Sequence, residues 1–328
     1  MRVGTICYSC HSGLGHLARD FYENGVISKI LIVPHRHYPN YPEWYPEKDR
    51  FSHNEFRKFI DEIDALLVFE NAFHWDVAQE AQRLGKMFVL MPMYEYTPMR
   101  RIEQVRPDLV LCPSLLDVDV YSSKFPTQYL PVPVDMQWKL RERAKVFVHN
   151  AGHAGWEYRN GTPELIKAIP HIKSDIQLII RGQPEDSKVR RLLSQPINDQ
   201  RVKIEMREVS NTESLFDIGD VLVAPERYNG LSLPLQEAYA SGMLVMTTDR
   251  YPMNTWLPNE PMLPVQGTEE VRIEIPFERC ILSPVEIAQT IDKWYDRDIT
   301  RFSELGRDYG TEHSWEALKQ SYLDIFQG

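Results

Sequence analysis

The stretch NGLSLPLQEAYASG, residues 229–242, places a carboxylate shortly after a loop that can begin a helix. Pro234 favours the first turn of a helix, so the N–H groups of Ser232 and Leu233 are expected at its N-terminal end. Glu237 then lies on the second turn, where its carboxylate can accept hydrogen bonds from neighbouring hydroxyls such as those of a ribose. A solvated surface glutamate is the alternative, but the apolar runs VLVAP and MLVMTTD on either side favour a Glu237 that faces a ligand.

Two arginines follow apolar runs in the same half of the chain. Arg159 belongs to VFVHNAGHAGWEYRNGTPELIKAI, which is typical of a strand, a glycine-bearing loop and a helix capped by Thr162. Arg181 ends the strand-like run LIIRG. A guanidinium group offers a fork of donors that matches phosphate oxygens, so the two arginines are candidates for binding a diphosphate. Solvated charges at strand ends are the alternative, but two arginines at one edge of a sheet favour the phosphate interpretation.

A glycine-bearing turn also follows the first apolar run, in SCHSGLGHLARDFYENG. Gly13 and Gly15 allow a tight turn and a close approach of the backbone to a ligand. His11, Ser12 and His16 crowd the same turn, which favours ligand contact over a purely structural turn. A third glycine and a suitably placed acidic residue are both missing, and their absence argues against a dinucleotide-binding fingerprint.

Composition excludes several other classes of protein. Cys7 and Cys10 form a C-x-x-C, but the sequence has no second such pair, so neither a metal site nor a disulfide framework is expected. The net charge of −10 argues against a large basic surface for nucleic acid. No apolar run is long enough to span a bilayer, and the start of the chain lacks a secretory signal, so we expect a cytoplasmic location.

Short apolar runs alternate with helix-length segments through both halves, the pattern of parallel sheets covered by helices. We expect an α/β protein made of two doubly wound, Rossmann-like domains that face a cleft. Pro131 and Pro133, with a polar, helix-like stretch after them, place the boundary near residues 134–143. The expected domains are residues 1–136, joined by a C-terminal helix at about 314–328, and residues 137–313. The expected strands are VGTICYS, KILIVPH, ALLVFEN, MFVLMPM, LVLCPS and YLPVPV in the first half, and KVFVHNAG, IQLIIRG, VKIEMRE, VLVAP and LVMTTD in the second.

Four stretches, which follow one another in the chain in the order expected for the family, resemble the family-4 glycosyltransferases. APERYNGLSLPLQEAYASGMLVMTTD is similar to the donor-site signature of that family: Pro-Ser, two residues, Glu-Gly-Phe-Gly-Leu-Pro, two residues and Glu-Ala. PVPVD resembles its interdomain linker, RNGTPELIKAI its Lys-Gly-x-x-x-Leu-Ile-x-Ala helix, and EHSWEALKQSYLDIF its closing Ser-Trp-Glu helix. The resemblance covers nearly the whole chain.

The resemblance implies a GT-B fold with an N-terminal acceptor-binding domain and a C-terminal domain that binds a nucleotide-diphosphate sugar, UDP- or GDP-linked, without a further cofactor. Glu237 would then bind the ribose, and Arg159 and Arg181 the diphosphate. The other residues implied at the donor site are Gly13, Gly15, Asn229, Gly230, Leu231, Ser232 and Leu233.

The sequence departs from the family signature at two places. Asn229 stands where the family has its first glutamate, and Leu231-Ser232 where it has Phe-Gly, so the contacts to the sugar are expected to differ more than those to the nucleotide. An amide can still bond a sugar hydroxyl, but it carries no charge.

The resemblance also implies transfer with retention of anomeric configuration, with the leaving diphosphate stabilised by the arginines and by helix N-termini. Glu95, in MPMYEYTP, lies roughly where the family often has a histidine, and His16 is its rival for a catalytic role. The acceptor is left open among a carbohydrate, a small molecule and a hydroxymethylated base in DNA. A non-catalytic protein that binds sugar nucleotides is a further alternative.

Overall fold

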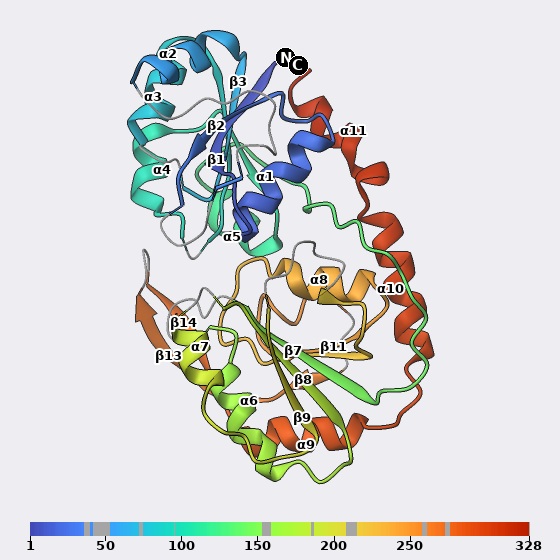
Figure 1. Ribbon diagram of the computed structural model, residues 1–328. Helices are drawn as coiled ribbons and strands as arrows, with labels where there is room; N and C mark the ends of the chain where they lie inside the picture. Colours follow the sequence, from blue (N-terminus) through green and yellow to red (C-terminus); the bar gives the residue numbers. More distant parts are fainter. Residues whose placement is uncertain are drawn as a thin grey trace. The chain divides into compact units, whose positions relative to one another are not determined.

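The computed structural model describes residues 1–35, 40–41, 53–71, 75–94, 96–152, 159–184, 187–207, 215–257, 261–272 and 276–327. The chain divides into two compact units, which are coloured from blue through red along the sequence in Figure 1. Unit 1 comprises Met1–Val132 and Trp315–Gly328, and unit 2 comprises Pro133–Ser314. Unit 1 ends at Val132, four residues before the expected boundary at 136. The C-terminal segment that belongs to unit 1 begins at Trp315, where residue 314 was expected.

Unit 1 is a six-stranded sheet in the order β2-β1-β3-β4-β5-β6, in which every pair of neighbours is parallel. The strands are β1 (Val3–Tyr8), β2 (Lys29–Val33), β3 (Ala65–Phe69), β4 (Met87–Met91), β5 (Leu109–Cys112) and β6 (Thr127–Tyr129). The helices are α1 (Gly13–Glu23), α2 (His53–Glu62), α3 (Trp75–Arg83), α4 (Met99–Val105), α5 (Leu115–Tyr121) and α11 (Trp315–Ile325). Apolar residues of α2, α3 and α4 share one core with the strands, and these helices cover one face of the sheet (Figure 1).

The C-terminal helix α11 belongs to unit 1 because aromatic side chains attach it to α1. The ring of Phe21 on α1 packs edge-on against the rings of Trp315 and Tyr322, with centroids 4.9 Å apart in both pairs. The Tyr322 hydroxyl donates to the Pro131 carbonyl at 2.8 Å. The two ends of the chain therefore lie side by side, as Figure 1 shows.

Unit 2 is a second parallel six-stranded sheet, in the order β12-β11-β10-β7-β8-β9. Its strands are β7 (Val146–Gly152), β8 (Gln177–Gly182), β9 (Val202–Met206), β10 (Val221–Ala224), β11 (Leu244–Thr248) and β12 (Met262–Leu263). Its helices are α6 (Thr162–Ala168), a 3-10 turn (Ile169–His171), α7 (Ser187–Leu193), α8 (Leu233–Ala240), α9 (Pro284–Trp294) and α10 (Thr300–Glu312). Helices α6, α7 and α9 contribute to one core, and α8 to the core on the other face.

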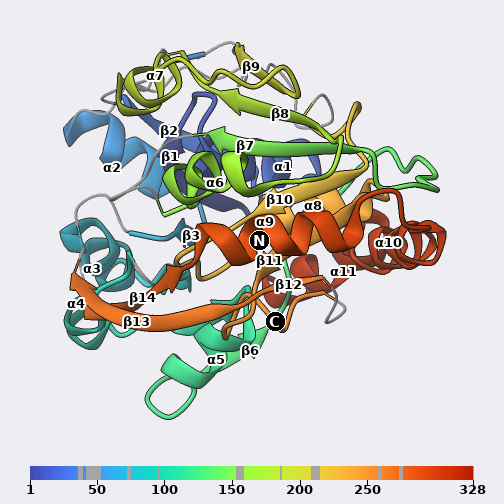
Figure 2. The same ribbon diagram turned by 90° about the horizontal axis from the view of Figure 1, so that it is seen from below.

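A two-stranded antiparallel ribbon is added to unit 2 between β12 and α9. It consists of β13 (Val265–Arg272) and β14 (Pro276–Leu282) and forms the long orange strip of Figure 2. Phe277, Arg279, Cys280 and Leu282 are buried, and Cys280 and Leu282 join the core of unit 2, so β14 packs against the unit. The sequence reasoning did not predict these two strands.

Ten of the eleven expected strands lie where they were expected, within a few residues at their ends. The eleventh, YLPVPV, is wrong: β6 ends at Tyr129, because Pro131 and Pro133 cannot donate to a ladder. The polar stretch after Pro133 is also not a helix, since residues 133–142 have no regular structure. Arg141 instead anchors this segment, since its buried guanidinium donates to the carbonyls of Gly219 at 3.2 Å and Phe216 at 2.6 Å.

Candidate functional site

The strand orders fix where each sheet is open to a ligand. In a parallel sheet, the loops after two adjacent strands diverge where the strand order reverses, and this leaves a crevice at the carboxyl ends. That point lies between β1 and β3 in unit 1 and between β7 and β10 in unit 2. The loops after β1, β7 and β10 carry most of the site residues expected from the sequence, whereas Arg181 lies on β8.

The loop after β10 is built around a buried carboxylate, Glu226, which is 7% exposed. Its Oε1 accepts from the Asn229 amide at 3.2 Å and from the Ser232 hydroxyl at 2.8 Å. Asn229 in turn accepts the N–H groups of Leu231 at 3.1 Å and Ser232 at 2.7 Å. These two N–H groups are therefore used within the loop.

Ser232 explains one departure from the family signature. It is the N-cap of α8 and has a φ of 47°, in the left-handed region that favours glycine. The family has a glycine at this position, the residue that adopts a left-handed backbone most readily, and here a serine adopts it. Its hydroxyl bond to Glu226 offsets part of the cost of that backbone conformation.

Helix α8 begins at Leu233, with Pro234 in its first turn as expected. Glu237 follows in the middle of the helix and is half-buried, between buried Gln236 and Ala238. Gly230 and Leu231 are buried, and Leu233 is half-buried. The structure thus brings together Asn229, Gly230, Leu231, Ser232, Leu233 and Glu237 on one loop and its helix.

The start of α6 packs directly against this loop. Gly161 has a φ of 68°, and a Cβ on it would lie 2.0 Å from the carbonyl oxygen of Pro225. The Arg159 carbonyl accepts the N–H of Arg227 at 2.6 Å. Arg159 therefore lies beside the β10 loop, and the half-buried position of its side chain is compatible with a ligand at the same edge.

Thr162 is not the cap that the sequence suggested, because Gly161 takes the N-cap position of α6. The Thr162 hydroxyl instead lies 2.8 Å from Nε2 of His149 and 3.0 Å from Oδ1 of Asn160. His149 Nδ1 donates to the Val223 carbonyl at 2.8 Å. Burial lowers the pKa of His149 to about 4, against the smaller opposing effect of that carbonyl. The imidazole is therefore a neutral link between β7, β10 and α6.

Arg181 lies in β8 with its side chain 3% exposed. Its Nε donates to Glu205 on the neighbouring strand at 3.1 Å, and its Nη1 to the Leu215 carbonyl at 2.5 Å. Asp217 lies 3.6 Å from its Nη2. A diphosphate would have to share Arg181 with these partners, so its predicted phosphate contact stays a prediction.

The antiparallel ribbon of β13 and β14 also contacts the loop after β10. The Tyr228 ring packs on the Phe277 ring of β14 with centroids 4.4 Å apart. Arg227 donates to Glu269 of β13 at 2.8 Å and to the Cys280 carbonyl at 3.2 Å. Two consecutive residues before Asn229 are thus held by the ribbon, a support that the sequence signature does not contain.

In unit 1, the loop after β1 brings two imidazoles together. Nδ1 of His11 lies 3.3 Å from Nε2 of His16. Burial, followed by the charges of His11 and Arg19, lowers the pKa of His16 to about 4. His16 is therefore neutral at pH 7 and can accept a hydrogen bond or a proton.

The two glycines of this turn have different roles. A Cβ on Gly15 would lie 2.0 Å from the Cys10 carbonyl oxygen, whereas the same position on Gly13 has nothing within 4 Å. Ser12 caps α1 by accepting the N–H of Gly15 at 3.1 Å. Gly15 thus permits the close packing of α1 on its own loop, and Gly13 leaves open space where a ligand could approach.

The remaining expectations concern Glu95, the two N-terminal cysteines, a metal site and a membrane span. Glu95 lies outside the described residues. Cys7 and Cys10 are free and buried, and burial raises the pKa of both thiols. Among the described residues, no group of three or more His, Cys, Asp or Glu side chains could hold a metal ion. None of the described helices has the length and apolar character needed to cross a membrane.

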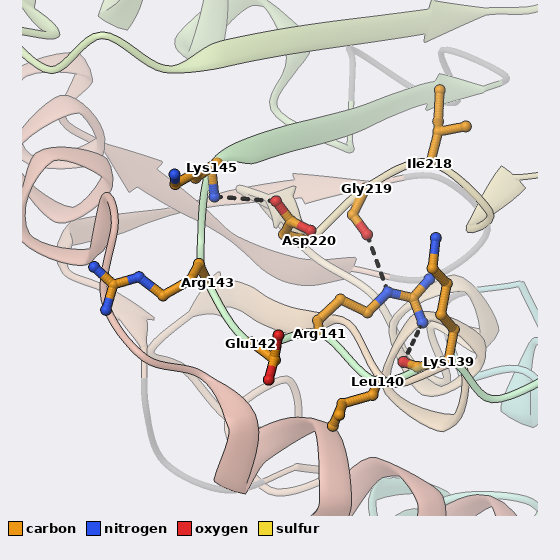
Figure 3. Close-up of a pocket in the computed structure, with 9 residues that line it drawn as sticks. All are labelled: Lys139, Leu140, Arg141, Glu142, Arg143, Lys145, Ile218, Gly219 and Asp220. Atoms are coloured by element: carbon orange, nitrogen blue, oxygen red, sulfur yellow. Dashed lines mark hydrogen bonds between the residues drawn. The ribbon is translucent and has the colours of Figure 1, made fainter.

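A cavity of about 290 Å³ lies at the opposite end of the unit 2 sheet (Figure 3). Its lining residues precede β7 and β10, so it opens at the amino ends of these strands. Figure 3 shows Arg141 donating to the Gly219 and Lys139 carbonyls across this cavity. Since parallel sheets bind ligands at the carboxyl ends, we do not assign the donor site to it.

Part of unit 2 matches a known protein family. Residues 145–260 match the family model described as "Glycosyl transferases group 1". This segment contains β7, the start of α6, the β10 loop and α8. No curated protein sequence matches the chain.

Solved structures match the chain over nearly its whole length. Sucrose-phosphate synthase from Thermosynechococcus elongatus superposes with a TM-score of 0.66 at 14% identity, over 99% of each chain. HepE from Anabaena, in complex with UDP and glucose, superposes with a TM-score of 0.67 at 12% identity, also over 99% of each chain. The lipopolysaccharide outer core galactosyltransferase WaaB has a TM-score of 0.61 at 12% identity, over 99% of this chain and 98% of its own.

At these identities the solved structures show the fold, which is the GT-B arrangement of two Rossmann-like domains. The sequence match shows the type of domain. Residues 145–260 match the family model of the glycosyl transferases group 1, and this match together with the GT-B fold indicates that the chain is a glycosyltransferase.

Proposed function

We propose that the protein transfers a sugar from a UDP- or GDP-linked donor to a hydroxyl group of an acceptor, with retention of anomeric configuration. Unit 2 binds the donor. Glu237 accepts hydrogen bonds from the ribose hydroxyls, and Arg159 and Arg181 bind the diphosphate. Unit 1 binds the acceptor, and its turn with Gly13 and Gly15 contributes to ligand binding.

The observation that carries the proposal is the loop after β10. It lies at the carboxyl end of the strand where the order of the sheet reverses, and Arg159 is joined to it by a backbone hydrogen bond. Fixed hydrogen-bonding groups at such an edge suit a ligand with hydroxyls and phosphates. HepE, which has the same fold, was solved with UDP and glucose, and this supports a nucleotide-sugar donor here.

In the proposed reaction, the bond between the anomeric carbon and the diphosphate oxygen breaks while the acceptor oxygen forms its bond on the same face. The electron pair leaves with the diphosphate, whose charge the arginines and helix N-termini stabilise. The acceptor proton passes to the leaving phosphate oxygen, which balances the step. His16 is neutral at pH 7 and is suited to accept a hydrogen bond from the acceptor hydroxyl. Glu95 is the other candidate for that role.

A panel of nucleotide sugars tests the proposal. A donor present at one hundred times its dissociation constant stabilises the protein by about 2.7 kcal/mol, which a thermal shift detects. The best donor is then incubated without acceptor, and NMR of the slowly released sugar reads its first-formed anomer. Retained configuration supports the proposal. Inverted configuration contradicts the retaining mechanism, and binding without any turnover favours a sugar-nucleotide-binding protein that is not an enzyme.

The acceptor needs a second screen with the same donor. Oligosaccharides, small hydroxylated molecules and DNA that contains hydroxymethylated bases represent the three classes that the sequence leaves open. Product formation with one class identifies the acceptor. The net charge of −10 favours the first two classes over DNA.

A further inference from the structure

Glu226 is a buried charge at the start of α8 with two side-chain donors on one oxygen. Asn229 and Ser232 both bond its Oε1, at 3.2 and 2.8 Å. Its backbone is fixed as well, because its N–H bonds the Ala224 carbonyl at 2.7 Å and its carbonyl accepts from Thr248 at 2.6 Å. The carboxylate therefore has one defined place in the loop.

The identity of residue 229 follows from this carboxylate. Residue 229 must donate to Glu226 on one side and accept two backbone N–H groups on the other. An asparagine amide has a donor end and an acceptor end and satisfies both. A glutamate has only acceptors, so it could not bond Glu226 and would set two carboxylates about 3 Å apart, where like charges repel strongly.

The charge of Glu226 also determines which ligand groups can bind at the start of α8. A negative charge beside a helix N-terminus neutralises part of the positive potential of that end. The same charge attracts hydroxyl donors and repels phosphate oxygens. At this position the loop is therefore suited to sugar hydroxyls, while the diphosphate is suited to the Arg159 side of the site.

We propose that Glu226 supplies the carboxylate of the sugar subsite, in place of the glutamate that the family signature has at the position of Asn229. It is a positioning residue, whose negative charge holds the Asn229 amide and the Ser232 hydroxyl in place and attracts a hydroxyl of the transferred sugar to this loop. This inference rests on the proposed function, since it names the residue that selects the sugar within the same donor site.

Substitutions that remove the carboxylate at position 226, add one at position 229, or do both test this role of Glu226. Glu226→Gln keeps an acceptor oxygen for Asn229 and Ser232 but removes the charge. Asn229→Glu adds a second carboxylate beside the first. The double variant carries both changes, so that the amide and the carboxylate exchange places and each group regains a partner. Glu270→Gln, at an exposed position of the ribbon, is the matched control for loss of a charge.

The measurements are the melting temperature without ligand, and the ratio of affinities for UDP-glucose over UDP and for GDP-mannose over GDP. For whichever of the two donors the parent protein binds, we expect Glu226→Gln to lower this ratio of affinities by about tenfold. The affinity for the free nucleotide should stay unchanged. Asn229→Glu alone should lower both the melting temperature and the ratio, and adding Glu226→Gln should restore them. Glu270→Gln should resemble the parent protein.

Two results would overturn the inference. One is an unchanged affinity ratio in Glu226→Gln, which would reduce Glu226 to a structural residue. The other is an Asn229→Glu variant that is as stable as the parent while Glu226 is present. A parent protein that binds neither donor contradicts the proposed function and this inference with it, whereas a parent that binds a donor with a ratio unaffected by Glu226→Gln contradicts the inference alone.

Discussion

The two units have sheets of the same kind but position their candidate groups in different ways. In unit 1, the loop after β1 closes on itself: Gly15 packs on the Cys10 carbonyl, and the imidazoles of His11 and His16 lie 3.3 Å apart. In unit 2, the loop after β10 is held by a buried carboxylate, by α6 and by the antiparallel ribbon. One unit thus presents a pair of imidazoles, and the other presents a loop that is held in place by a buried carboxylate and by its neighbours.

This difference separates what each unit contributes. The imidazole of His16 has a pKa of about 4, so it can take up a proton only transiently at neutral pH. Glu226 and Arg159 place a carboxylate and a guanidinium beside the loop after β10, which suits the binding of a donor that carries hydroxyls and phosphates. Changes in unit 2 should therefore affect donor binding, and changes around His16 should affect turnover.

The largest expected effect comes from blocking the close approach between the start of α6 and the loop after β10. In Gly161→Ala, the new Cβ meets the Pro225 carbonyl and the residue keeps a left-handed φ of 68°. We expect a loss of about 3 kcal/mol in the free energy of unfolding. Gly267→Ala is the control, because a Cβ there has nothing within 4 Å, and it should change stability by less than about 0.5 kcal/mol. Denaturant titration measures both, and equal midpoints would contradict the assigned packing.

The next effect concerns pH. His149 has a pKa of about 4 when folded and about 6.5 when unfolded, so the unfolded chain binds more protons between these values. Stability should therefore be complete above pH 6.5 and fall as the pH drops toward 4, by about 3 kcal/mol for this group. His149→Gln should flatten that slope, although it also lowers stability at pH 7. His16→Gln should flatten it less, since His16 is only half-buried. An acid slope that neither variant changes would count against both assignments.

A smaller effect is expected for the arginines. Arg159→Ala should weaken the binding of a nucleoside diphosphate by roughly 1.5–3 kcal/mol and leave nucleoside binding nearly unchanged. Arg181→Ala should do the same but should also lower stability, because it leaves Glu205 without a partner that it bonds at 3.1 Å. Arg143→Ala, which breaks an exposed pair with Asp296, is the control. Equal losses for nucleoside and diphosphate would exclude a phosphate contact.

Most of the fold could be predicted from the sequence because parallel strands buried on both faces are continuous apolar runs. ALLVF and VLVA are completely buried, as such runs are in a parallel sheet. The ribbon was missed because VQGTEEVR and PFERCIL carry charges at most exposed positions. The alternation of exposed Pro276 and Glu278 with buried Phe277 and Arg279 is the signal that could have revealed β14.

The site could be predicted in outline but not in its connections. The family signature located Asn229 and Glu237, and the structure places them on one loop and its helix. Sequence spacing gave no reason to connect Glu226 with Ser232, because their contact depends on the left-handed turn between β10 and α8. Arg181 was predicted to bind a diphosphate at a strand end, whereas its partners Glu205 and Leu215 come from segments whose pairing only the fold reveals.

Binding of nucleotide to Glu237→Gln tests the central claim, that unit 2 is a donor site, most directly. The substitution keeps the shape of the side chain, removes its charge and turns one acceptor into a donor. With the nucleotide that the panel selects, calorimetry should show an affinity reduced by roughly 1–3 kcal/mol in a protein that unfolds like the parent, while Glu270→Gln binds normally. A Glu237→Gln variant that binds the nucleotide as tightly as the parent would contradict the assignment of the donor site.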